Sequence, residues 1–219
     1  MNKAPVITID GPSATGKGTI ASRVAQRLGY HLLDSGALYR VLALAAHERG
    51  VDLDDGTAIA ALAPRLDIAF PANGKATLAG RDVSTEIRTG GNDERASRVA
   101  ALPEVRQILL PVQRGFRKPP GLVAEGRDMG EVVFPDARCK FFLTASAEIR
   151  ARRRHKQLIG KGLDARLPGL LRDLRSRDRR DEQRSISPSR PASGAVEIDT
   201  SELTIDQVVD RVMGVITAN

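Results

Sequence analysis

The sequence predicts an α/β fold in which a central parallel sheet is flanked by helices. Short apolar or β-branched runs alternate with longer segments of helical periodicity along most of the chain. The first run, 6–9, leads into a glycine-rich turn and then into a helix, as expected for an open parallel sheet. The length of 219 residues fits one domain that carries a small insertion.

The amino-terminal elements follow from local signals. The β-branched run 6–9 is expected to be a buried strand, and 19–28 a helix that ends at Gly29. Asp34-Ser35-Gly36 offers an N-cap for a second helix over 37–48.

The pattern changes between about residues 64 and 103. Short alternating pieces at 66–70 and 76–79 surround Asn73-Gly74, which is a hairpin signal, and a polar helix is expected over 91–101. We expect an insertion at 64–103 within a core formed by 1–63 and 104–219.

Three more strands and three more helices are expected after the insertion. The strands are 121–124, 140–144 and 195–199, and the helices are 147–158, 168–180 and 205–215. The whole chain, 1–219, is therefore expected to be one domain.

Composition excludes several classes of protein. The longest apolar runs have six residues, whereas a membrane helix needs about twenty. No signal peptide is recognisable, so we expect a cytoplasmic protein without a membrane partner. The single Cys139 excludes an intrachain disulfide, and the three histidines lack zinc spacing. Aromatic residues make up only 3%, which disfavours binding of single strands by base stacking.

The net charge of +7 comes from one segment. Residues 150–184 hold 13 Lys and Arg against 5 acids, and the rest of the chain is close to neutral. Eleven of the 13 cations are Arg, which suits bidentate phosphate binding. A solvated helix face is the alternative for about half of them.

Residues 11–19 match the pattern G-x-x-x-x-G-K between strand and helix. Gly11 and Gly16 allow successive N–H groups to face a phosphate, Lys17 can reach the β- and γ-phosphates, and a hydroxyl can lie near Mg²⁺. Gly18 follows the lysine, so the hydroxyl comes one place later, at Thr19. The residues expected to bind a nucleoside triphosphate are Gly11, Pro12, Ser13, Ala14, Thr15, Gly16, Lys17, Gly18 and Thr19.

A second set of charged residues could bind another anion. Arg127 and Asp128 follow a strand, at the sheet edge where ligands bind. Arg177, Asp181 and Arg184 share a helix face, which is either a salt-bridge ladder or a site for a second phosphate and a ribose.

The chain resembles the bacterial cytidylate kinase family over essentially its full length, and four segments carry the resemblance. The segments are Ile9-Asp10-Gly11-Pro12 with Gly16-Lys17-Gly18-Thr19, Leu33 to Arg40, Glu125 to Gly130 with Val132 to Ala137, and Arg177-Asp178 with Asp181 and Arg184. The resemblance implies a P-loop kinase with an NMP-binding subdomain near 64–103 and a mobile lid near 152–166.

The implied reaction transfers the γ-phosphoryl group of ATP to CMP, and also to dCMP, with Mg²⁺ accompanying ATP. Lys17, Arg127 and Arg184 would be catalytic, and no protein ligand of the metal is assigned. The implied CMP-binding residues are Ser35, Arg40, Ser97, Arg106, Arg127, Asp128, Arg177, Asp181 and Arg184. Among them Asp128, Arg106 and Ser97 would read cytosine, and Asp181 backed by Arg177 would hold the ribose. Without the resemblance, Ser97 would be read as a solvated helix serine.

The sequence departs from the family pattern at three places. Ala14 replaces a usual Gly as a modest steric change, Glu131 replaces a usual Thr, and Ser187-Pro188-Ser189 replaces Ala-Pro-Leu. We expect a monomer that acts on free nucleotides and binds no nucleic-acid polymer. A P-loop kinase for another small acceptor and an ATPase that binds nucleic acid through its basic helices are the alternatives.

Overall fold

The computed structural model describes residues 3–69, 75–160, 162, 164–184 and 186–218. The chain forms two compact units, one made of Met1–Leu33 with Phe116–Asn219 and the other of Asp34–Gly115. The second unit contains the stretch 64–103 that we expected to be inserted, together with helices on both sides of it.

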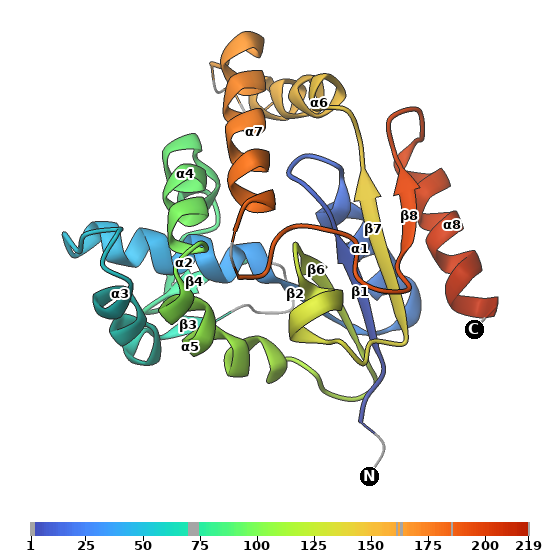
Figure 1. Cartoon of the computed structure of the whole chain (residues 1–219), viewed down its shortest axis with the longest axis horizontal. Coiled ribbons are helices and arrows are strands. Elements are labelled where there is room, and N and C mark those ends of the chain that lie inside the picture. The colour runs from blue at the N-terminus through green and yellow to red at the C-terminus, as the bar shows by residue number, and fades with distance from the viewer. Residues whose placement is uncertain (1–2, 70–74, 161, 163, 185, 219) are drawn as a thin grey trace. The chain divides into compact units, whose positions relative to one another are not determined.

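A five-stranded sheet forms the centre of the first unit (Figure 1). Its strands are β1 (Val6–Asp10), β2 (His31–Asp34), β6 (Leu122–Gly126), β7 (Cys139–Thr144) and β8 (Val196–Asp199), in the order β2-β6-β1-β7-β8. β1 pairs in parallel with both β6 and β7, so that Ile9 lies between Glu125 and Phe141. β7 and β8 are also parallel, which confirms the predicted parallel sheet.

Helices α1 (Lys17–Leu28) and α8 (Ile205–Ala218) share one hydrophobic core with the sheet. Ile20 and Val24 of α1 and Val212 of α8 are fully buried in it, because apolar residues recur at helical spacing on these faces. After β6 the chain makes a short π-helical turn, η3 (Met129–Val133), in which Met129 is fully buried.

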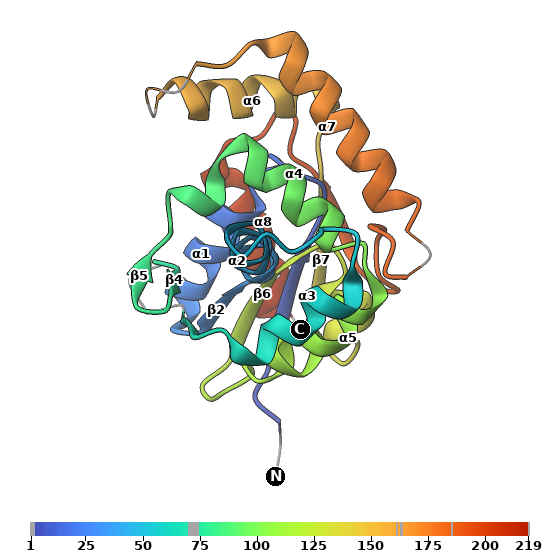
Figure 2. The ribbon, with the colours of Figure 1, turned by 90° about the vertical axis from the view of Figure 1, so that its left-hand side faces the viewer.

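Helices α6 (Ala147–Ile159) and α7 (Leu167–Glu182) pack against each other after β7 (Figures 1 and 2). The Ser146 hydroxyl caps α6 by accepting a hydrogen bond from the N–H of Ile149. Both helices were predicted from the sequence. Of the segment expected to be a lid, 152–166, residues 152–159 belong to α6, and residues 161 and 163 lie outside the described residues.

The second unit is mostly helical. It contains α2 (Ser35–Glu48), α3 (Gly56–Leu62), α4 (Gly90–Val99) and α5 (Pro103–Arg114), with 3₁₀ turns η1 (Ala63–Arg65) and η2 (Glu86–Arg88). Tyr39 and Leu42 of α2, Val99 of α4 and Leu109 of α5 meet in its core.

A small antiparallel sheet of β3 (Ile68–Ala69), β4 (Thr77–Leu78) and β5 (Arg81–Asp82) completes the second unit. The pairing of β3 with β4 agrees with the hairpin expected there, although Asn73-Gly74 lies outside the described residues. The turn from β4 to β5 uses Ala79 and Gly80, both at positive φ.

Candidate active site

The loop between β1 and α1 has the backbone that a phosphate cradle requires. Gly11 has φ +142°, and a Cβ there would lie 2.2 Å from the carbonyl oxygen of Leu143, so no other residue fits. Gly16 has φ +94° and immediately precedes α1. The predicted order of strand, glycine-rich loop and helix is therefore present.

Ala14 is a residue with a side chain in the left-handed region of this loop, at φ +61°. A Cβ in this region approaches the following carbonyl oxygen, which costs about 1–2 kcal/mol. Ala14 in place of glycine therefore strains the backbone of the loop. The sequence suggested only a modest steric change.

We expect Ala14→Gly to raise the free energy of unfolding by about 1 kcal/mol, because glycine adopts φ near +60° without that cost. Urea unfolding of the two proteins measures the difference. Ala79→Gly, at φ +50° in the β4–β5 turn, is the matched control for relief of strain outside the loop. A lower stability of Ala14→Gly would contradict the assignment of strain.

Lys17 is buried at the start of α1. Its Nζ donates to the Pro12 carbonyl oxygen at 3.2 Å and lies 3.9 Å from Oε2 of Glu125. The Thr15 hydroxyl also donates to Pro12 O, at 3.1 Å, and so holds the loop closed. Glu125, at the end of β6, had no role in the sequence analysis, and the structure makes it the carboxylate partner of the lysine.

Asp10 is a second buried carboxylate that the sequence did not single out. Its two oxygens accept hydrogen bonds from the N–H groups of Met129 and Gly130, each at 2.9 Å, and so anchor the turn that carries Arg127 and Asp128. Burial raises the pKa of Asp10 to about 7; the two N–H groups oppose this rise and the neighbouring charge of Asp128 adds to it.

The raised pKa predicts a dependence of stability on pH. Because the folded state holds the Asp10 proton more tightly than the unfolded chain, its contribution is full below about pH 4 and is lost as the pH rises to about 7. The slope from this group is at most about 1.4 kcal/mol per pH unit. Urea unfolding at several pH values should show this decline in the wild-type protein and a flatter profile in Asp10→Asn. Equal slopes would contradict the prediction.

Three arginines surround one carboxylate in the first unit. Asp181, which is 3% exposed, accepts from Arg127 Nε at 3.0 Å and from Arg184 Nη2, and Arg177 Nε lies 3.9 Å away. Burial opposes ionisation of Asp181, but the three guanidinium groups hold its pKa below the usual value. The structure thus brings together Arg127, Arg177, Asp181 and Arg184, all predicted from the sequence.

The arginine cluster is connected to the phosphate loop. Arg127 Nη2 donates to the Ser13 hydroxyl at 3.0 Å. Arg150, which is 5% exposed, donates to the Ser13 carbonyl oxygen at 3.2 Å and forms a bidentate ion pair with Asp178 at 2.6 and 3.1 Å. Arg150 therefore faces the loop and not solvent, a role that sequence reasoning missed.

Arg40 is held at the amino end of α2 in the second unit. Asp34 caps this helix by accepting from the N–H of Ala37 at 2.8 Å, and its carboxylate also accepts from Arg40 Nη2 at 3.0 Å. A Cβ on Gly36 would lie 3.1 Å from Nη1 of Arg40, so the guanidinium group lies against this glycine. Ser35, the first residue of α2, is buried and accepts a hydrogen bond from Gln113 at 2.9 Å.

Ser97 and Arg106, the other predicted residues of this unit, are also buried. The Ser97 hydroxyl on α4 has no hydrogen-bond partner among the described residues and is 1% exposed, so the reading as a solvated serine is wrong. Arg106 on α5 donates to Ala100 O at 3.0 Å and lies over the ring of Tyr39. A buried hydroxyl without a partner is costly, and a ligand that supplies one would remove that cost.

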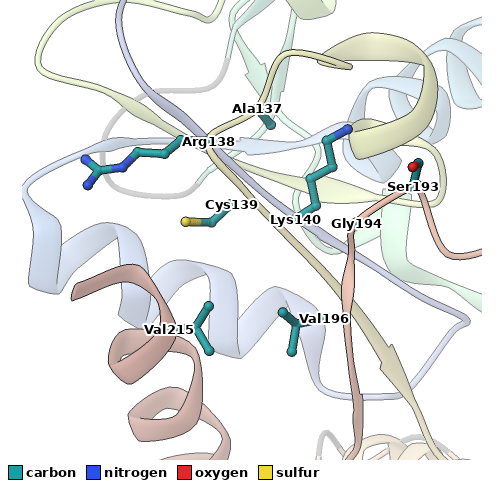
Figure 3. A pocket seen from close by; sticks show the side chains of 8 residues that line it. All are labelled: Ala137, Arg138, Cys139, Lys140, Ser193, Gly194, Val196 and Val215. Carbon is teal, nitrogen blue, oxygen red and sulfur yellow. The ribbon is translucent and has the colours of Figure 1, made fainter. Parts of the chain in front are cut away.

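The structure also contains a hollow of about 340 Å³ at the amino ends of β7 and β8 (Figure 3). Arg138 and Lys140 extend away from each other there and do not converge on one ligand. Burial raises the pKa of the Cys139 thiol, which keeps it protonated and unreactive. We therefore assign no chemistry to this hollow.

No described helix is long and apolar enough to cross a membrane. No group of three or more His, Cys, Asp or Glu among the described residues could hold a metal ion.

The parallel sheet carries a strand, a phosphate loop and a helix that begins with a buried lysine, and the loop is joined to a cluster of arginines. This arrangement defines a P-loop kinase. A solved structure of a protein from Eubacterium ventriosum shares the fold at 12% identity, with a TM-score of 0.50 over 98% of this chain and 99% of that one.

The cytidylate kinase family model matches residues 7–218. A cytidylate kinase of Bordetella pertussis is 58% identical over 96% of this chain and 94% of its own length. One from Methylococcus capsulatus is 54% identical over 98% of both chains. The chain belongs to the cytidylate kinase family.

Proposed function

We propose that this protein transfers the γ-phosphoryl group of ATP to CMP, and also to dCMP, with CDP or dCDP and ADP as products. Membership of the cytidylate kinase family supports the substrate. One contact supports the reaction most directly, namely the hydrogen bond from Arg127 Nη2 to the Ser13 hydroxyl. It connects an arginine that we assign to the acceptor phosphate with the loop that we assign to the donor phosphates, as transfer between two anions requires.

We assign ATP to the loop residues 11–19, with Lys17 on its β- and γ-phosphates. Mg²⁺ usually keeps several waters and is bound by substrate phosphates with only one or two protein oxygens. Gly18 and Thr19 in the first turn of α1 are exposed, and the Thr19 hydroxyl fits such a loosely held ion. When bound, the ion would neutralise charge on the transferred phosphoryl group.

We assign CMP to the residues that the resemblance names. Arg40, Arg127 and Arg184 would bind its phosphate, and Ser35 would contact the same nucleotide. Asp128, Arg106 and Ser97 would read cytosine, and Asp181 with Arg177 would hold the ribose. The buried Ser97 hydroxyl without a partner supports this assignment, because a ligand would satisfy it.

Phosphoryl transfer requires the neutralisation of charge more than covalent catalysis. An oxygen of the CMP phosphate attacks the γ-phosphorus while the bond to the β–γ bridging oxygen breaks, and ADP leaves with that oxygen. A phosphate dianion is already nucleophilic near neutral pH, so no strong base is required. We also propose that the segment 152–166 closes over the substrates as a lid and excludes water.

A coupled ADP-release assay with CMP, dCMP, UMP, AMP and GMP tests the proposed function. We expect CMP and dCMP to be the best acceptors and ADP release without an acceptor to be slow. A preference for another acceptor would contradict the proposal. ADP release that is stimulated by a single-stranded nucleic acid, and that salt weakens steeply, would instead identify an ATPase that binds nucleic acid through the basic helices α6 and α7.

A further inference from the structure

Arg150 is a buried arginine near the start of α6 whose guanidinium group is held by several partners at once. Nε donates to the Ala145 carbonyl oxygen at 2.9 Å, and the two terminal nitrogens form the ion pair with Asp178 at 2.6 and 3.1 Å. Nη1 also donates to the Ser13 carbonyl oxygen at 3.2 Å, across 137 positions of sequence. All four residues belong to the first unit. A donor that is itself fixed therefore holds one carbonyl group of the phosphate loop.

This hydrogen bond determines the direction of one peptide group of the loop. In a trans peptide the C=O and the N–H point in opposite directions. Because the Ser13 carbonyl oxygen faces Arg150, the N–H of Ala14 points away from Arg150. This N–H has no acceptor among the described residues. It is therefore available to an anion, as the N–H groups of a phosphate-binding nest are.

The same peptide group leads into the strained residue of the loop. Ala14 has φ +61°, in the left-handed region that alanine avoids. Rotation of the Ser13–Ala14 peptide would return Ala14 to a negative φ, and it would also turn the Ala14 N–H to the opposite side. The hydrogen bond from Arg150 to Ser13 opposes this rotation. With glycine at position 14 the rotation would release no strain, because glycine adopts both signs of φ about equally well.

We propose that Arg150 is a positioning residue that holds the Ser13–Ala14 peptide in its strained orientation and so keeps the Ala14 N–H directed at the donor phosphates of ATP. The inference rests on the proposed function, which assigns ATP to this loop, and adds a residue to it. Arg150 acts through the loop and does not itself touch the nucleotide. Asp178 shares the role, because its bidentate ion pair fixes the plane of the guanidinium group.

The dependence on residue 14 makes the inference testable by ATP binding. Arg150→Lys keeps the charge but loses the fork that reaches Ser13 and Asp178 together. We expect it to raise the Kd for ATP with Mg²⁺ about tenfold, because the relaxed loop must return to the left-handed conformation before it binds. In the Ala14→Gly background the same substitution should raise this Kd by at most about twofold, since glycine populates both conformations about equally. Isothermal titration calorimetry without CMP measures each Kd.

Arg175→Lys is the matched control for the contact between the two helices. Arg175 of α7 also pairs with α6, through Glu148 at 2.6 Å, but about half of each side chain is exposed. Its substitution should leave the Kd for ATP unchanged whether residue 14 is alanine or glycine. Equal increases for Arg150→Lys in the two backgrounds would overturn the inference, and so would an unchanged Kd in both.

A stability measurement tests the same inference without ATP. Ala14→Gly should raise the free energy of unfolding less in Arg150→Lys than in the wild-type protein, because a relaxed loop holds no strain for glycine to release. An equal gain in both proteins would overturn the inference. If Arg150→Lys does not fold, Asp178→Asn replaces it in both experiments, since it weakens the ion pair that orients Arg150, and the same signs are expected.

Failure of the proposed function is distinguishable from failure of this inference. Wild-type protein that bound no ATP, or that failed to phosphorylate CMP, would refute the proposed function. The stability measurement would still show whether Arg150 holds the strained peptide.

Discussion

Lys17→Ala should lower the turnover number for CMP phosphorylation by on the order of 10²-fold or more. The charge of this lysine matters most when negative charge moves onto the β–γ bridging oxygen in the transition state. The substitution also removes the ammonium group 3.9 Å from Glu125, so that a buried carboxylate is left beside the loop to which we assign the donor phosphates. Steady-state kinetics with saturating ATP and CMP measure the effect.

Two further variants separate the roles of Lys17 and Glu125. Lys17→Ala combined with Glu125→Gln should recover part of the loss if repulsion by the carboxylate contributes. The exposed Lys118→Ala is the control for loss of a lysine elsewhere, and it should behave as the wild type. An unchanged turnover number with only a raised KM for ATP would contradict the assignment of Lys17 to the transition state.

Asp128→Ala should abolish most activity on CMP and most of the preference for CMP over UMP. Cytosine presents an amine that needs an acceptor, whereas uracil presents a carbonyl oxygen at the same position, and a buried carboxylate distinguishes them. Asp128 is 4% exposed and begins the turn that Asp10 anchors. Polar sites of this kind discriminate by as much as about 10⁴-fold. The ratio of kcat/KM for CMP and UMP measures this effect.

Asp136→Ala is the matched control for Asp128→Ala. Asp136 follows in the same segment but is exposed and pairs with Arg117 at 2.8 Å, so its loss should leave the preference for CMP intact. Asp181→Ala should have the smaller effect and act on the choice between CMP and dCMP. If Asp128→Ala kept both its activity on CMP and its preference over UMP, cytosine would be read by other residues.

Local sequence signals predicted the strands and helices that carry the phosphate loop. They missed β2, in which only Leu33 is buried, and α5, whose buried face mixes Val105 and Leu109 with Arg106 and Gln113. Val105 and Leu109 are four positions apart, the spacing that predicts a helix, so hydrophobic periodicity could have found α5. Of the two polar residues that are buried on this helix, Arg106 is one that we assign to CMP.

The resemblance identified Arg127, Arg177, Asp181 and Arg184 as one set, and the structure brings them together around Asp181. It gave no role to Asp10, Glu125 or Arg150. Each of these is a charged residue that is buried against the loop or the turn after β6. Burial of a charge has no signature in the sequence, because a partner distant along the chain makes it possible.

The sequence by itself determined the parallel α/β fold, the phosphate loop and the family, because these depend on spacing along one stretch of chain. Only the tertiary structure decided the backbone strain, the protonation and the hydrogen bonding of individual residues. It determined the strain at Ala14, the raised pKa of Asp10 and the hydrogen bond that Ser35 accepts from Gln113. Backbone strain, desolvation and hydrogen-bond direction all depend on neighbours that folding supplies, and Gln113 reaches Ser35 across 78 positions of sequence.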